Sequence, residues 1–359
     1  VEDVESALPE GLYETPRISH VYLYSLMDDL YNERFYSSLL VYAKERYNLT
    51  LPEKPLPLEK DPNKAVTQLE RAVSVEGVKG AFCIGLVHKN ADEHDFITNT
   101  CGRLSIPSKC ISTEVTEEIC AGKLQSLKYV CSSIISRAGG VPWILHDKLN
   151  HDCYVAVDVG RSRAEWWAMS VVYDRDGKYT VRQGNLMVGE DLDEQSIRMC
   201  VMAASEFAPN SESLILLRHG DIHEGERRAF TESSAKLDYA ETAIVSIKEN
   251  VPYRIFRRLN SYISKPISGD YYPLDRLNVV LCGAGGEEYE HGTPQPMVAE
   301  IIHVKGEVDT AKVIEDLFRL TFLNWGSPGR SYSLPAPIHL AHKFAYELSA
   351  GIQRFGPPF

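Results

Sequence analysis

Short apolar runs alternate with segments of helical periodicity from residue 20 to residue 149. Three runs are apolar enough to form buried strands: residues 20–27 (HVYLYSLM), 78–87 (VKGAFCIGLV) and 107–115 (PSKCISTEV). Between them, apolar residues recur every three or four positions over 30–47 and 65–75, a spacing typical of helices. This alternation predicts a parallel sheet flanked by helices.

The same region contains residues that interrupt regular structure. Residues 52–64 (PEKPLPLEKDPNK) are too rich in proline for a helix or a strand and predict a surface connection. A helix over 124–137 is expected to end before Gly139, Gly140 and Pro142. The region as a whole is Rossmann-like, although it lacks a GxGxxG motif.

After residue 152 the pattern changes to long strands that follow one another directly. The predicted strands are 153–160, 165–174, 178–188, 213–220 and 242–249, with a helix over 193–207. The DRDG sequence at Asp174–Gly177 predicts a tight turn between the second and third strands. Three antiparallel strands followed by strands that alternate with helices is the order of the RNase H-like fold. We therefore predict two domains, residues 1–150 and 151–359.

Composition agrees with a globular chain of this size. The 359 residues correspond to about two domains at about 150 residues each. The 44% hydrophobic and 25% charged residues exclude disordered and coiled-coil classes. No run approaches the roughly 18 consecutive apolar residues that a membrane helix requires.

Charge and cysteine usage narrow the class further. With 38 Lys and Arg against 50 Asp and Glu, the formal charge of −12 argues against a protein that coats nucleic acid, although net charge does not report how charge is distributed. The eight cysteines contain no CxxC pair and predict reduced core residues. With no signal peptide visible after Val1, we expect a cytoplasmic location.

Two segments carry candidate chemistry. Asp158 lies within the apolar strand AVDVG, where a carboxylate is costly unless it is paired or binds a metal; an Asp that caps a following turn is the alternative. A helix that begins near Pro337 places His339, His342 and Tyr346 on one face. These histidines are either ligands or general bases, or partly buried residues with their hydrogen bonds satisfied.

Six motifs in order give the chain a family resemblance. They are IPSK (106–109), GGVPW (139–143), the DV of AVDVG, RHG (218–220), GTPQP (292–296) and LPAPIHLAH (334–342). With them the sequence resembles the MID and PIWI domains of prokaryotic Argonaute proteins, either a short Argonaute or the C-terminal half of a long one. The resemblance implies an α/β chain with a Rossmann-like MID domain followed by an RNase H-like PIWI domain.

The resemblance also implies a set of catalytic positions. Active members hold two divalent ions with three acidic residues and a His or Asp, because Mg²⁺ and Mn²⁺ prefer oxygen ligands. The matching positions here are Asp158, His219 and His342, with Glu190 or Glu194 as the remaining glutamate.

His219 stands where active members have an acid, which predicts a PIWI domain that has lost cleavage. Two alternatives remain open. Asp221 could supply the missing carboxylate, or Asp158, His219 and His342 could bind a different metal as a set of two histidines and one carboxylate.

The guide-anchoring positions depart from the family as well. The positions that grip the 5′ end of the guide are Asp95, Asn99, Lys109 and Arg137. Lys109 and Arg137 suit a phosphate, whereas Asp95 would repel it. The pocket therefore holds a 5′-hydroxyl end, binds weakly, or uses another cation such as Lys89. Arg137 is alternatively a cation stabilised by the dipole of its own helix.

Further contacts follow from the same resemblance. The carboxylate of Phe359 is expected to enter the guide pocket and hold Mg²⁺ or Mn²⁺ there, or else Phe359 simply packs. Lys248, Arg254 and Arg330 are expected to contact the phosphate backbone of the guide–target duplex.

Together these expectations describe a binding protein. We predict that it holds a short guide RNA or DNA and its complementary target, does not cleave, involves no membrane, and acts with an effector-associated PAZ-like partner in prokaryotic defence. An active metal-dependent guided endonuclease with a divergent tetrad is the first alternative. A scaffold protein that keeps only the PIWI fold is the second.

Overall fold

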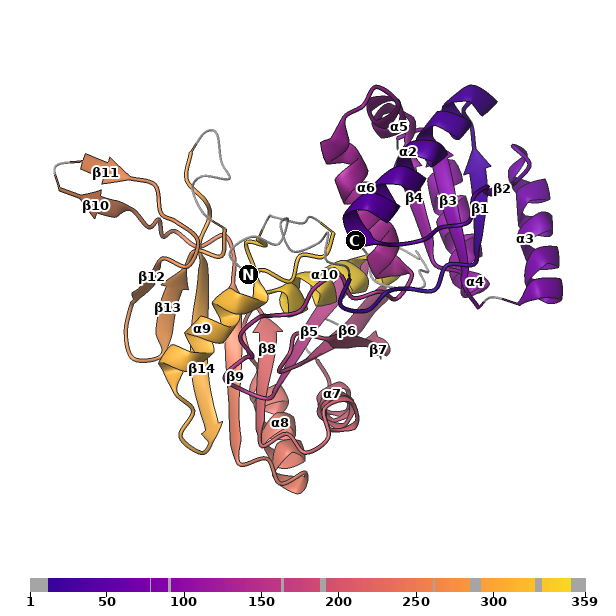
Figure 1. Ribbon diagram of the computed structural model, residues 1–359. Helices are drawn as coiled ribbons and strands as arrows, with labels where there is room; N and C mark the ends of the chain where they lie inside the picture. Colours follow the sequence, from indigo (N-terminus) through magenta and orange to yellow (C-terminus); the bar gives the residue numbers. More distant parts are fainter. Residues whose placement is uncertain are drawn as a thin grey trace. The chain divides into compact units, whose positions relative to one another are not determined.

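The computed structural model describes residues 12–77, 79–89, 92–162, 165–187, 192–260, 262–284, 292–326 and 331–349. Its contacts divide the chain into two compact units (Figure 1). The first contains the described residues up to Trp143 together with Trp325 and Gly326, and the second contains 144–324 and 331–349. The division thus falls at Trp143, close to the boundary expected at 150, and a short later segment returns to the first unit.

The first unit is built on a parallel sheet with the strand order β2-β1-β3-β4. Its strands are β1 (His20–Ser25), β2 (Leu56–Pro57), β3 (Ala81–Val87) and β4 (Ser108–Ser112). Its helices are α2 (Asp29–Tyr47), α3 (Pro62–Glu76), α4 (Asp92–Arg103), α5 (Thr113–Cys120) and α6 (Leu124–Arg137). All seven residues of β3 are buried, as expected for a parallel strand covered on both faces. The predicted Rossmann-like α/β architecture is confirmed.

Two local expectations for this unit were wrong, for reasons of capping and pairing. Within the proline-rich segment 52–64, Leu56 and Pro57 pair with β1, and α3 begins at Pro62 because Asp61 caps its first turn. The strand expected over 107–115 ends at Ser112, because the Ser112 hydroxyl accepts a hydrogen bond from the Val115 amide and begins α5.

The second unit is built on an eight-stranded sheet with the order β12-β13-β14-β9-β8-β5-β6-β7. Its strands are β5 (Cys153–Ser162), β6 (Glu165–Asp174), β7 (Tyr179–Met187), β8 (Ser213–His219), β9 (Glu241–Lys248), β12 (Tyr271–Pro273), β13 (Asn278–Leu281) and β14 (Met297–Lys305). A separate hairpin consists of β10 (Arg257–Leu259) and β11 (Tyr262–Ser264). Strands β5, β6 and β7 pair antiparallel, whereas β8 and β9 join β5 in parallel, which confirms the predicted RNase H-like order.

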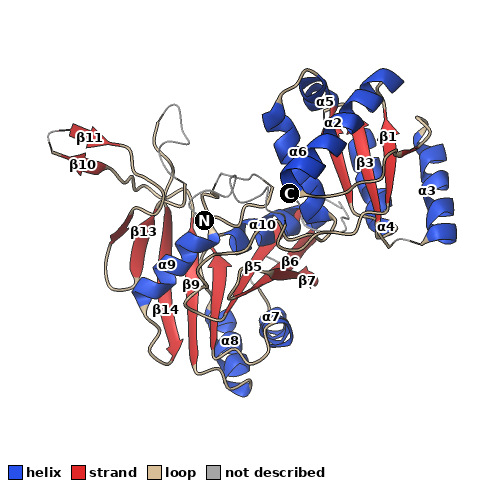
Figure 2. Ribbon diagram, viewed as in Figure 1, coloured by secondary structure: helices blue, strands red, loops and turns tan. Residues whose placement is uncertain are grey.

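Helices of the described residues cover this sheet (Figure 2). They are α7 (Glu194–Phe207), α8 (Glu224–Lys236), α9 (Thr310–Leu320) and α10 (Ala336–Ser349). Val155 and Val157 of β5 pack in one core with residues of α7 and α8. Since successive side chains of a strand point to opposite faces, Tyr154 and Asp158 face the other way, where Tyr154 contacts Asp316 of α9 and Asp158 contacts α10. Among the described helices, none is long and apolar enough to cross a membrane.

Candidate functional site

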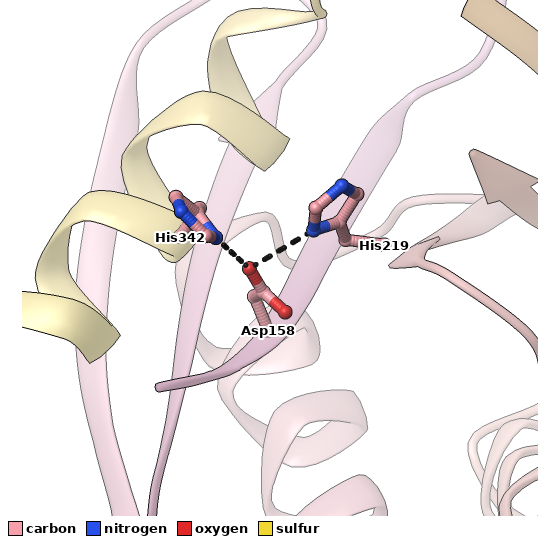
Figure 3. Close-up of side chains that lie close together, drawn as sticks. All are labelled: Asp158, His219 and His342. Atoms are coloured by element: carbon pink, nitrogen blue, oxygen red, sulfur yellow. Dashed lines mark hydrogen bonds and ion pairs between the residues drawn. The ribbon is translucent and has the colours of Figure 1, made fainter. Parts of the chain in front are cut away.

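Asp158, His219 and His342 come together in the second unit (Figure 3). Oδ2 of Asp158 lies 2.7 Å from Nδ1 of His342 and 3.3 Å from Nδ1 of His219. The two imidazole rings meet edge to face, with their centroids 5.4 Å apart. Three segments far apart in the sequence, β5, the end of β8 and α10, thus supply one cluster.

Strand register explains how the first two residues meet. The parallel pairing of β5 with β8 sets Val157 opposite Arg218, so the next residue of each strand, Asp158 and His219, points to the opposite face. Helix α10 lies on that face and brings His342 over Asp158. Gly160 permits this approach, because a Cβ at residue 160 would meet the backbone of α10.

Asp158 is a buried ionised carboxylate. Its side chain is 6% exposed, Oδ1 accepts a hydrogen bond from the Val159 amide at 2.8 Å, and Nη1 of Arg218 lies 3.5 Å from Oδ1. Burial alone would raise the pKa of Asp158, but the hydrogen bonds with His219 and His342 outweigh it and lower the pKa to about 2. Asp158 therefore carries its negative charge throughout the neutral range.

His219 carries the matching positive charge. Its Nε2 lies 3.5 Å from Oε2 of Glu249, on the side of the ring away from Asp158. The hydrogen bonds with Asp158 and Glu249 raise the pKa of His219 to about 9. The hydrogen bond with Asp158 also raises the pKa of His342. The cluster is an ion-pair network in which an imidazolium joins two carboxylates.

Glu249 and the contact of Arg218 with Asp158 were not predicted from the sequence. The position of Glu249 follows from strand register. Strands β8 and β9 pair in parallel with His219 opposite Ile247, so Glu249, which follows the end of β9, lies at the same edge of the sheet as His219. Arg218 belongs to the RHG motif, but its part in the cluster depends on the three-dimensional approach of β5 and β8.

His339 does not join the cluster, although it lies on the same helix as His342. Its ring stacks on Tyr332 with the centroids 4.1 Å apart. Burial, with smaller contributions from Lys343 and His342, lowers the pKa of His339 to about 4. A neutral stacked imidazole fits the alternative of a partly buried packing residue.

The donor set decides which ions the cluster suits. Ligand atoms of Asp158, His219 and His342 all lie within 4.8 Å of one another. A pair of Mg²⁺ or Mn²⁺ ions needs several shared carboxylate oxygens, whereas these three residues offer one carboxylate and two imidazoles. The set does not fit the paired-ion centre of active Argonautes. Two histidines and one carboxylate instead suit a single transition-metal ion.

The two remaining catalytic candidates that the structure describes, Glu194 and Asp221, pair with other residues. Glu194 begins α7 and forms ion pairs with Arg198 and Arg228. The Asp221 carboxylate lies 2.5 Å from Nζ of Lys248, so it is directed to that lysine. Glu190 lies outside the described residues, as do the expected duplex contact Arg330 and the chain terminus Phe359. Arg254, the remaining duplex candidate, is exposed and donates to the carbonyl oxygens of residues 251 and 253.

The first unit contains a cavity of about 560 Å³ at the carboxyl ends of β3 and β4. In parallel α/β sheets, ligands bind at this edge. Of the expected guide-pocket residues, Asp95 and the alternative cation Lys89 line the cavity, while Asn99, Lys109 and Arg137 are not among its lining residues. The cavity walls also include His88 and His94 together with Asp92, so both basic and acidic side chains line it.

Arg137 makes a hydrogen bond within the first unit. Its side chain is buried, and Nη1 donates to the carbonyl oxygen of Ser108 at 2.9 Å. Because Arg137 is the last residue of α6, this bond fastens the end of the helix to the beginning of β4.

Comparison with known proteins agrees with this architecture. No protein-family model matches the chain. Over 228 residues the chain is 27% identical to the protein argonaute of Pyrococcus furiosus, a match that covers 59% of this chain and 28% of that protein. The chain is homologous to this Argonaute. The resemblance predicted from the six motifs is thereby confirmed.

The shared fold extends over almost the whole chain. Clostridium butyricum Argonaute, solved with a guide DNA carrying a 5′ deoxycytidine and a 19-mer target DNA, superposes with a TM-score of 0.81 at 20% identity. The alignment covers 97% of this chain and 50% of the Clostridium chain. The present chain therefore has the fold of the MID and PIWI domains and spans half the length of that Argonaute.

Proposed function

We propose that the chain holds a short guide strand and its complementary target and does not cleave the target through a paired-ion centre. The observation that carries this proposal is the pairing of His219 with Asp158. Where active Argonautes place a second shared carboxylate, this chain places an imidazole whose pKa is about 9. A positive charge at that position opposes the entry of two divalent cations.

The binding role rests on the shared fold and on base pairing. In guided systems the sequence is read by Watson–Crick pairing, while the protein contacts backbone and shape. A chain with a formal charge of −12 can still bind in this way, because a few cations along a groove are enough when pairing supplies the selectivity. We assign the first unit to the 5′ end of the guide, with a divalent ion bound there, and the second unit to the duplex, with Lys248, Arg254 and Arg330 on its backbone.

A guided binder that does not cut has no effect by itself. The proposal therefore includes a partner effector with a PAZ-like segment, in the cytoplasm of a prokaryotic cell, that responds when the target is bound. Copurification of a tagged chain from its native host, with and without a matching target, tests for this partner. A chain that is recovered alone under both conditions contradicts that part of the proposal.

The first experiment identifies the guide. Nucleic acid extracted from the purified chain is sequenced and treated with phosphatase and kinase to define its length, sugar and 5′ group. A population of uniform short strands supports the proposal. Recovery of no short nucleic acid, together with salt-independent binding of added oligonucleotides, favours the scaffold alternative.

The second experiment tests cleavage. Guides with a 5′-phosphate or a 5′-hydroxyl are loaded, and a labelled complementary target is incubated with Mg²⁺ or Mn²⁺. We expect target binding without a cut. A single cut that is lost in Asp158→Ala establishes the alternative, an active endonuclease with a divergent tetrad. That alternative is kept because Asp158, His219 and His342 can hold a single transition-metal ion.

A further inference from the structure

Three of the eight cysteines meet in the core of the first unit. Cys83 of β3 and Cys101 of α4 are fully buried there, and Cys110 of β4 packs against the same core while remaining partly exposed. All eight cysteines are free thiols. None of these three belongs to the Asp158 cluster, which lies in the second unit. The first unit thus contains a group of neighbouring thiols for which the proposed function has no use.

Cys83 and Cys101 are in contact between β3 and α4. The thiol of Cys83 is hydrogen-bonded to that of Cys101. This hydrogen bond and burial raise the pKa of the Cys83 thiol, so the thiol is protonated at neutral pH. Buried, protonated thiols react slowly with oxidants. The pair therefore stays reduced until a local opening of α4 admits an oxidant.

Cys110 connects this pair with the cavity at the carboxyl ends of β3 and β4. It pairs with Gly85, which follows Cys83 by two residues and so lies on the same face of β3. A Cβ at residue 85 would lie 3.0 Å from Sγ of Cys110, so the glycine leaves room for the cysteine. Sγ of Cys110 lies 3.7 Å from Oγ1 of Thr98 in α4, and Cys110 lines the cavity. A small oxidant in the cavity thus reaches the core that holds the buried pair.

Helix α4 joins the cysteine pair to the cavity wall. Asp92, His94 and Asp95 at the start of α4 line the cavity, and Cys101 lies about two turns further along the same helix. A disulfide holds its sulfur atoms about 2.0 Å apart, closer than two hydrogen-bonded thiols can be. Bond formation therefore draws α4 toward β3. Because protein cores are close-packed, the helix moves as a body and takes its cavity-lining residues with it.

We propose that Cys83 and Cys101 form a reversible disulfide that alters the cavity of the first unit and weakens its hold on the guide. The effect on the guide rests on the proposed function, whereas formation of the bond does not. The oxidant is a peroxide. One thiol takes an oxygen atom from hydrogen peroxide, releases water and becomes a sulfenic acid; the second thiol attacks that sulfur and releases another water. Two thiols and one peroxide thus give one disulfide and two waters, and a dithiol reverses the reaction by exchange.

Peptide mapping of the wild-type chain detects the bond. The reduced chain is treated with hydrogen peroxide, its remaining thiols are blocked with iodoacetamide in denaturant, and it is digested with trypsin without reductant. Because trypsin cuts after lysine and arginine, Cys83, Cys101 and Cys110 fall in the separate peptides 80–89, 90–103 and 110–123. We expect mass spectrometry to find peptide 80–89 linked to peptide 90–103, and dithiothreitol to remove the link. No link between these two peptides, or a link of either one to 110–123 alone, overturns the proposal.

Guide binding measures the consequence. The probe is a fluorescein-labelled short DNA strand, with a 5′-phosphate or a 5′-hydroxyl, followed by fluorescence anisotropy. We expect the peroxide-treated chain to bind it at least about fivefold more weakly than the reduced chain, and dithiothreitol to restore the affinity. Since coupling between two sites is reciprocal, saturating probe should make the disulfide easier to reduce by the same factor in a dithiothreitol titration. A disulfide that forms without changing the affinity overturns its regulatory role.

Alanine variants assign the effect to the pair. Cys101→Ala should lose both the linked peptides and the response of guide binding to peroxide. Cys131→Ala, at a buried cysteine of α6 in the same unit, is the matched control and should keep both. Thermal melts establish that the variants are folded, and the wild-type peptide map decides the bond without any variant. A response to peroxide that persists in Cys101→Ala belongs to another thiol and overturns the proposal. A chain that forms the disulfide but binds no guide in either state contradicts the proposed function, while the disulfide stands.

Discussion

Gly160 of β5 lies directly against the backbone of Ala345 in α10. A Cβ at residue 160 would overlap both the carbonyl carbon and the carbonyl oxygen of Ala345, closer than any side chain allows. Ala345 lies almost one helical turn after His342, so this approach also fixes how near His342 comes to Asp158. Packing of a helix on a strand thus determines the geometry of the charged cluster.

Gly160→Ala should separate α10 from β5. Because the new methyl group meets backbone and not the end of a flexible side chain, we expect a loss of about 1–3 kcal/mol in the free energy of unfolding. Urea denaturation measures it. Gly225→Ala in α8 is the matched control. Apart from its chain neighbours and its own helix backbone, no described atom lies within 4 Å of the place of an added Cβ, and alanine favours helices, so stability should rise slightly. Equal effects of the two substitutions would show that α10 does not rest on Gly160.

The charge of His219 should make stability depend on pH. A pKa raised from 6.5 to about 9 in the folded state means that His219 stabilises the fold fully below pH 6.5 and that this stabilisation is lost as the pH rises through about 9. The difference corresponds to at most about 3 kcal/mol. Free energies of unfolding at pH 6 and pH 10 measure the loss, and the histidine proton resonances followed by NMR locate the titration.

Asp158→Asn removes the carboxylate that contributes most to this shift. We expect the titration of His219 to move toward its ordinary value and the loss of stability at high pH to become smaller. Asp221→Asn serves as the control, because the Asp221 side chain is 76% exposed and paired with Lys248. A titration of His219 that is the same in wild type and Asp158→Asn would rule out Asp158 as its cause.

His219→Asp should create a site for hard divalent ions. The substitution places a second carboxylate beside Asp158 and removes the imidazolium, which gives the arrangement that Mg²⁺ and Mn²⁺ prefer. We expect Mn²⁺ to bind the variant at least tenfold more tightly than the wild type, as measured by calorimetry or by the spin resonance of free Mn²⁺. His219→Asn removes the positive charge without adding a negative one, so it separates the two effects. Tight binding of Mn²⁺ to the wild type, lost in Asp158→Asn, would contradict our account of this cluster.

Alternation of apolar residues was enough to predict β1, β3 and β4 of the first sheet and β5 to β9 of the second, because these strands form clear apolar runs, but it did not predict β2 or β12 to β14. It failed where a single side chain decided the outcome. The Ser112 hydroxyl ends β4 and begins α5, and Asp61 begins α3 within a proline-rich segment, although neither changes the hydrophobic pattern. Such caps contribute local hydrogen bonds that periodicity does not record.

The order of the motifs predicted that Asp158, His219 and His342 belong together, and the structure brings them together. It could not predict Glu249, whose place follows from the parallel register of β8 and β9. Nor could it predict that Arg137 turns inward to Ser108, because the phosphate-binding and helix-terminal roles require the same residue type. Pairings between distant elements are properties of the assembled sheet, and one sequence contains them only implicitly.

Asp316 should be a costly carboxylate to neutralise. It lies in α9 and is fully buried. Its Oδ2 lies 2.7 Å from the Tyr154 hydroxyl and 2.9 Å from Nδ1 of His151. Its Oδ1 accepts a hydrogen bond from the backbone amide of Asn150 at 2.8 Å. In Asp316→Asn, one oxygen that accepts these bonds becomes an amide group that donates. We expect a loss of about 3 kcal/mol in the free energy of unfolding at pH 7.

This loss should shrink in acid. Burial opposes ionisation of Asp316, but the hydrogen bonds from His151, Asn150 and Tyr154 prevail and lower its pKa below 3.8. A carboxyl group whose pKa is lowered by folding stabilises the fold at pH values above its pKa in the unfolded chain. This stabilisation disappears as the pH falls through its pKa in the folded chain. Urea denaturation at pH 7 and pH 3 should therefore show the wild type approaching Asp316→Asn at the lower pH. The control is Glu315→Gln at the exposed neighbouring position, which should change stability little at either pH. If the loss of stability in Asp316→Asn is the same at both pH values, hydrogen-bond geometry and not charge is responsible.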